Sequence, residues 1–74
     1  MNKEQLINEL DKIAKARVQA RGVKPSYGDP LQSYLVSELI DMYEEDEANI
    51  TSELEEAYNE LIGKYNAYIS TEYF

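Results

Sequence analysis

The side chains of this sequence that could do chemistry are carboxylates, amines, guanidinium groups and the hydroxyls of tyrosine, serine and threonine, since it contains neither histidine nor cysteine. The most common general base, the thiol nucleophile and the usual zinc ligands are therefore missing. Carboxylates are plentiful, but their spacing places them on exposed faces of predicted helices rather than opposite one another across a cleft. We expect a protein that is not an enzyme and that uses neither a metal ion nor another cofactor.

The densest group of carboxylates is the run of four acidic residues from Glu44 to Glu47. It falls at the end of a predicted helix, where negative charge opposes the helix dipole. The run lacks the alternating acids, central glycine and distal glutamate of a calcium-binding loop. It is either a solvated charge run or part of a surface that docks on a basic partner. The predicted acidic docking surface consists of Asp41, Glu44, Glu45, Asp46, Glu47, Glu53, Glu56 and Glu60.

The net charge of −8 is distributed unevenly along the chain. Residues 1–24 hold six of the seven basic groups with three acids, whereas residues 25–74 hold one basic group with twelve acids. The two parts should attract each other, so we expect the basic end of the first helix to lie against the acidic elements. The remaining negative field would attract a basic partner.

Apolar residues recur at helical spacing in three segments of the chain. This pattern predicts an all-α fold, a small three-helix bundle with helices over about 2–21, 30–47 and 51–72. A chain of 74 residues has room for one small core. We therefore expect residues 1–74 to form a single helical domain.

The predicted first helix carries an apolar stripe that includes Leu10 and Ile13. Gly22 suits the left-handed position after its end, and Pro25 and Pro30 prevent the helix from continuing. The following segment connects the first helix to the second as a turn-rich loop of ordinary length.

The second helix, residues 30–47, is expected to lie at the centre of the bundle. Its apolar side chains spread over about two thirds of the circumference, so two neighbouring helices must cover it. Asp29 is the predicted N-cap residue, with Pro30 at the first helical position and Gln32 placed to complete the cap.

The third helix, residues 51–72, is expected to begin with a capping box formed by Ser52 and Glu55. It also brings several of the seven tyrosines onto its apolar face. Rings in this position either form the edge of a core or belong to an interface, where tyrosine is favoured for its large area and polar tip. The candidate interface tyrosines are Tyr34, Tyr43, Tyr58, Tyr65 and Tyr68.

Arg17 interrupts the apolar stripe of the first helix, and Arg21 follows almost in line one turn later. A guanidinium group there must either reach past the edge of the core or pair with a carboxylate of another helix. The alternative is that Arg17, Arg21 and Lys24 contact an anionic ligand or a second subunit.

These features favour a small acidic module that docks on a basic surface of a partner protein, as an inhibitor or regulator that mimics nucleic acid would. Small acidic helical proteins of phages and mobile elements often act in this way, which is an analogy of composition alone. The alternative is a self-assembling structural protein that forms a helical homo-oligomer. Independently of function, we expect the chain to self-associate, most simply as a homodimer, because a single core of this size hardly covers the second helix. A third hypothesis is a binder of a small anion at the basic end of the first helix.

Direct binding to nucleic acid is not expected, because the basic cluster is modest and the rest of the chain repels phosphate. No apolar run approaches the roughly 18 residues of a membrane span, and the first residues lack the apolar block of a signal peptide. A chain without cysteine is also compatible with a reducing compartment. We therefore expect a cytoplasmic protein without a membrane partner.

Overall fold

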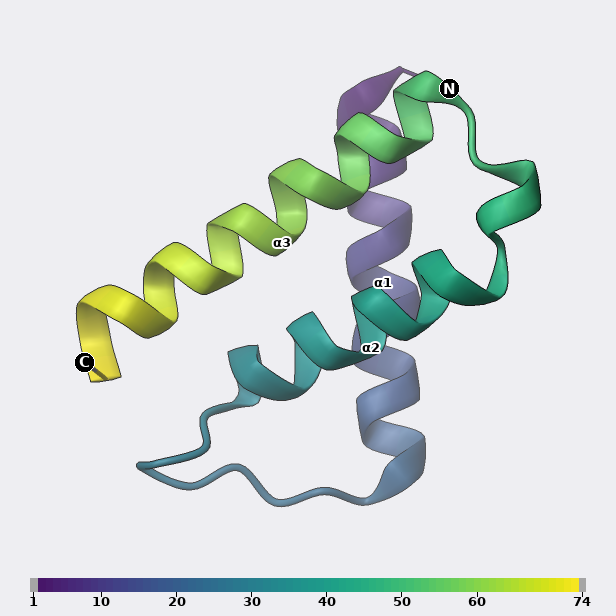
Figure 1. Ribbon diagram of the computed structural model, residues 1–74. Helices are drawn as coiled ribbons and strands as arrows, with labels where there is room; N and C mark the ends of the chain where they lie inside the picture. The colour runs from purple at the N-terminus through teal and green to yellow at the C-terminus, as the bar shows by residue number, and fades with distance from the viewer. Residues whose placement is uncertain (1, 74) are drawn as a thin grey trace.

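The computed structural model describes residues 2–73 as a three-helix bundle (Figure 1). Its elements are α1 (Lys3–Arg21), α2 (Leu31–Glu45), a short 3-10 helix (Glu47–Asn49) and α3 (Ser52–Tyr73), with no β-strand in the described part of the chain. Every pair of α-helices is in contact. In Figure 1, α1 crosses behind α2 and α3, so one face of the α2–α3 pair is turned away from α1. The prediction of an all-α three-helix bundle is confirmed.

The first turns of α1 and α3 are fixed by side chains that accept hydrogen bonds from the backbone. Asn2 and Gln5 form a reciprocal capping box at the start of α1, in which Oδ1 of Asn2 lies 2.8 Å from the backbone nitrogen of Gln5. At α3, Oγ1 of Thr51 accepts a hydrogen bond from the backbone N–H of Leu54 at 3.1 Å. The capping residue of α3 is therefore Thr51, one residue before the predicted Ser52.

The prediction that Asp29 caps α2 is wrong. Pro30 occupies the N-cap position, and no side chain caps this helix. The Asp29 carboxylate instead accepts a hydrogen bond from the Tyr34 hydroxyl at 2.7 Å, and the backbone of Asp29 pairs with that of Ser26 across a tight turn. Because the side chain of Asp29 binds Tyr34 and its backbone belongs to the turn, Asp29 forms no capping box with Gln32.

The ends of α1 and α2 differ in how well the sequence predicts them. Gly22 has φ +67° and donates its N–H to the carbonyl of Gln19, as the left-handed position after a helix requires. The second helix ends at Glu45, two residues before the predicted end, because Asp46 leaves helical geometry with φ −114°. Several carboxylates at the negative end of a helix dipole disfavour a longer helix. The acidic run is thus divided between the last turn of α2 and the 3-10 helix.

The core consists of one stripe of side chains from each helix, and α2 contacts both neighbours as its wide apolar face requires. Leu39 is fully buried, whereas Ile13, which the pattern assigned to the apolar stripe of α1, is 44% exposed. The buried apolar and aromatic side chains are Leu10, Ala14, Val18, Leu35, Leu39, Met42, Ala57, Tyr58, Leu61 and Tyr65.

Candidate functional site

A network of ion pairs joins the C-terminal half of α1 to α2. Arg17 places Nε 3.1 Å from Oε1 of Glu38 and Nη2 2.7 Å from Oε2 of Glu45. Arg21 places Nε 2.7 Å from Oε2 of Glu38 and Nη2 3.8 Å from Oδ2 of Asp41. The predicted pairing of Arg17 with a carboxylate of another helix is confirmed, and the basic end of α1 lies against acidic residues as expected.

Glu38 is the member of this network that sequence reasoning missed. It is only 3% exposed, and it lies in the buried stripe of α2 between Leu35 and Met42. Each of its carboxylate oxygens accepts from one arginine, which is the pairing that a buried charge requires. The available signal was its position in the middle of an apolar stripe, in a chain where Arg17 also interrupts one.

The network determines which carboxylates are neutralised within the molecule. A bidentate hydrogen bond from Arg17 lowers the pKa of Glu45 below its ordinary value. Asp41 is turned toward Arg21, and Oε2 of Glu60 on α3 lies 3.1 Å from Nζ of Lys3 at the start of α1. Three members of the predicted acidic docking surface therefore already pair with cations of α1.

The other members of that surface have no cationic partner. No ion pair within residues 2–73 involves them, and Asp46 accepts a hydrogen bond from the amide of Asn49. Helical spacing places two of them on the stripe of α3 that contains Glu60. The predicted surface thus contains both paired and unpaired carboxylates. Its unpaired carboxylates belong to Glu44, Asp46, Glu47, Glu53 and Glu56.

Two of these unpaired carboxylates border a groove between α2 and α3. This α2–α3 groove has a volume of about 340 Å³ and is lined by Ile40, Tyr43, Glu44, Glu47, Asn59 and Ile62. Ile40 is 43% exposed although its neighbour Leu39 is fully buried. Two residues along a helix turn the side chain by about 200°, so Ile40 lies on the side of α2 opposite the buried Glu38. The groove therefore opens on the face turned away from α1.

The predicted interface tyrosines take different positions. Tyr58 and Tyr65 are buried in the core, and burial raises the pKa of Tyr58. Tyr43 is half-buried and packs edge-on against Tyr58, with ring centroids 5.4 Å apart. Tyr34 is half-buried and bound to the loop through Asp29, whereas Tyr68 is 41% exposed.

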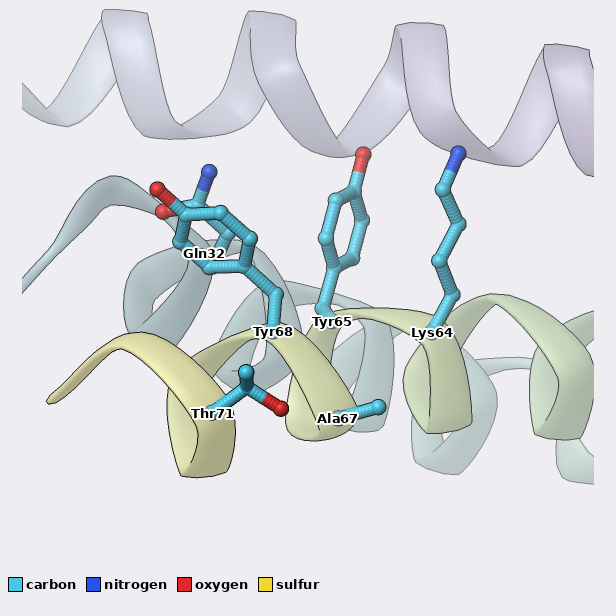
Figure 2. A pocket seen from close by; sticks show the side chains of 6 residues that line it. All are labelled: Gln32, Lys64, Tyr65, Ala67, Tyr68 and Thr71. Atoms are coloured by element: carbon cyan, nitrogen blue, oxygen red, sulfur yellow. The ribbon is translucent and has the colours of Figure 1, made fainter. Parts of the chain in front are cut away.

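A second hollow, of about 480 Å³, lies beside Tyr65 near the C-terminal end of α3 (Figure 2). Figure 2 shows Tyr65 and Lys64 reaching from α3 toward α1, while the ring of Tyr68 turns toward Gln32 of α2. The Tyr65 hydroxyl donates to Asp11. Burial and then this hydrogen bond raise the pKa of Tyr65. One polar group of this hollow, the Tyr65 hydroxyl, thus joins α3 to α1.

The basic end of α1 is already occupied by protein carboxylates. Arg17 and Arg21 both bind Glu38, so an anion at this position would have to displace an internal partner. Lys24 is exposed and forms no ion pair in the described part of the chain. The three side chains of the predicted anion contact therefore do not converge on an open site.

A scan against protein-family models, a search of curated proteins and a search of solved structures each gave no match to this chain. Among residues 2–73, no three acidic side chains are grouped so that they could hold a metal ion. Of the described helices, none combines the length and apolar character needed to cross a membrane.

Proposed function

We propose that this chain is a small protein-binding module that docks through unpaired carboxylates on a basic surface of a partner protein. The observation that carries the proposal is the unequal use of charge inside the fold. Lys3, Lys15, Arg17 and Arg21 are all held in internal ion pairs. In contrast, Glu44 and Glu47 lie beside an open groove without a cation of their own.

The uneven use of charge makes the outside of the α2–α3 pair the part of the surface best suited to attract a cation. The net charge of −8 adds a long-range negative field, which accelerates encounter with a positively charged partner and weakens as salt is added. A protein surface that normally holds nucleic acid has the required charge. An inhibitor or regulator that competes with nucleic acid for such a surface is the form of this function that we propose.

The proposed role is binding rather than catalysis, and it requires no cofactor. A chain without histidine or cysteine lacks the groups that most often transfer protons or form covalent intermediates near neutral pH. As the compartment of the interaction we propose the cytoplasm, because a fold without cysteine does not depend on oxidising conditions.

The test compares partner capture by the wild-type chain and by two charge variants. The first variant carries Glu44→Gln and Glu47→Gln, and it keeps Glu45 because Glu45 is bound to Arg17. The matched control carries Glu4→Gln and Glu9→Gln on α1, where both residues are exposed. Proteins captured from lysate are identified by mass spectrometry, and the affinity of the purified partner is then measured across a salt series.

We expect basic proteins to be captured by the wild type and by the α1 control, and about tenfold weaker binding by the first variant, mainly through slower association. The wild-type complex should weaken as salt rises. Equal capture by all three proteins, with affinity independent of salt, would contradict the proposal and leave the acidic run as a solvated charge run.

A further inference from the structure

We infer that the α2–α3 groove binds a basic amphipathic helix supplied by the partner. This inference rests on the proposed function and specifies the form of its ligand. Its starting point is that the groove is not simply acidic. Ile40, Tyr43 and Ile62 are its apolar lining residues, here called the apolar floor, and Glu44 and Glu47, three residues apart in the sequence, are its acidic lining residues, here called the charged edge.

The apolar floor requires an apolar ligand group. Ile40 is exposed to almost the same extent as Ile13 on α1, but Ile13 lines neither the α2–α3 groove nor the hollow beside Tyr65, whereas Ile40 lines the groove. A flat basic surface could pair with the carboxylates but would leave this floor in water. A ligand that also inserts a side chain of leucine or isoleucine size buries both kinds of surface.

The backbone of the groove favours a helical ligand over an extended one. An extended peptide gains its affinity by adding to the edge of a sheet, and the described part of the chain contains no strand. The groove walls are helices, whose interior backbone groups are already hydrogen-bonded. A helix satisfies its own backbone and can lay an apolar stripe between α2 and α3, in the way that one helix packs on two others. The ligand helix would lie on the face opposite α1.

The carboxylates determine the sign of the charge that the ligand must carry. Covering the groove with a neutral or acidic helix would desolvate Glu44 and Glu47 without giving them a partner, which is unfavourable. The same argument disfavours a second copy of this chain in a face-to-face dimer, because each copy would bring its own Glu44 and Glu47 to the contact. Lysine or arginine residues flanking the apolar stripe of the ligand would pair with both.

The probe for this inference is a synthetic peptide of about 18 residues, long enough to form a helix on binding. It carries leucine at helical spacing on one face and lysine at the other positions. The control peptide has the same composition, but its leucines are dispersed around the helix. Affinity is measured by fluorescence anisotropy and helix formation by circular dichroism.

Two pairs of protein variants locate the contact. Ile40→Ser removes the exposed floor of the groove, and Ile13→Ser is its control at equal exposure on α1. Glu44→Gln with Glu47→Gln removes the charged edge, and Glu53→Gln with Glu56→Gln removes the same charge from another stripe. All six substitutions in these four variants are at exposed positions, so each variant should keep the fold.

We expect the amphipathic peptide to bind and to become helical, and the dispersed peptide to bind at least tenfold more weakly. Ile40→Ser and the Glu44/Glu47 variant should each weaken binding about tenfold, while their controls change it less than twofold. Equal binding of both peptides, with an effect of the charge variant but none of Ile40→Ser, would overturn the inference and leave the proposed function intact. Equal effects of Ile13→Ser and Ile40→Ser would overturn the placement in the groove.

Two further outcomes separate the remaining possibilities. If the wild-type chain self-associates at low salt and Ile40→Ser abolishes that association, the groove belongs to a second copy and the inference is overturned. If neither peptide binds and the captured partners are not basic, the proposed function and the inference both fail.

Discussion

Nε of Arg17 lies 3.1 Å from Oε1 of Glu38, and this contact joins the edge of the α1 stripe to the buried centre of α2. Each residue would be unfavourable at its position without the other, because a charge removed from water needs a partner of opposite sign. Arg21 completes the arrangement by binding the second oxygen of Glu38. The carboxylate is thus held between two guanidinium groups that reach past the core edge.

The first prediction is that Glu38→Ala destabilises the fold by about 2–3 kcal/mol. Loss of a buried charge partner commonly costs more, but Arg17 keeps Glu45 and Arg21 is exposed enough to be hydrated. The free energy of unfolding is measured by urea denaturation. The double variant Arg17→Met with Glu38→Leu should recover most of the loss, because an apolar pair of similar volume avoids the desolvation cost. A double variant as unstable as Glu38→Ala would show that the network is not a paired unit.

The second prediction concerns acid and rests on Asp11. Burial alone would raise its pKa, but hydrogen bonds from Lys15 and Tyr65 lower the pKa of Asp11 below its ordinary value. The native state therefore binds this proton less readily than the unfolded chain, whose aspartates titrate near pH 4. The resulting stability is present above that pH and is lost as pH falls through the lowered native pKa.

We accordingly expect Asp11→Asn to be less stable than the wild type at pH 7 and to lose less stability on acidification. Denaturant unfolding at a series of pH values from about 6 to 2.5 gives the slope of the free energy of unfolding against pH. Glu9→Gln on the same helix controls for the removal of one charge. If the stability of Asp11→Asn fell with pH as steeply as that of the wild type, Asp11 would not be the source of this acid sensitivity.

The third prediction uses two glycines with different backbone conformations. Gly63 lies in the middle of α3, and a methyl group added there would meet nothing within 4 Å. Gly63→Ala should therefore stabilise the fold by about 0.5–1 kcal/mol. Gly22 also has open space, but its φ is +67°, so Gly22→Ala should destabilise by about 1 kcal/mol. Thermal unfolding of both variants checks the opposite signs, and a shift of the same sign in both would contradict the argument.

The sequence alone predicts the helices well because their signals are local. Gly22, Pro25 and Pro30 separate the first two helices, and periodic apolar residues define the face of each. Because Arg17 lies on the apolar stripe of α1, its need for a carboxylate partner also follows from the sequence. Caps are harder to predict, because the Asp29 side chain binds the Tyr34 hydroxyl instead of a backbone N–H, and neighbouring polar residues such as Thr51 and Ser52 can compete for the same backbone group.

The candidate site could not be predicted in the same way because it depends on how the helices are rotated about their axes. Glu44 and Glu45 are adjacent in sequence, but one borders the α2–α3 groove and the other binds Arg17. A step of about 100° along the helix separates their directions. Helical periodicity alone does not reveal which face of α2 meets α1. Burial of Glu38 on that face is what leaves Ile40 and Glu44 facing outward.

The last prediction separates a second copy from a basic partner as the molecule that covers Ile40. A homodimer remains a prediction from the small size of the core, but α1 and α3 already cover the core face of α2 within one chain. Contact between two grooves would bring like charges together, so added salt should strengthen that contact. Added salt should instead weaken the binding of a basic helix. At low salt we therefore expect Ile40→Ser and the wild type to have the same mass by light scattering, whether that mass is a monomer or a dimer. A lower mass for Ile40→Ser would show that attraction between apolar floors outweighs the repulsion of Glu44 and Glu47 across the interface.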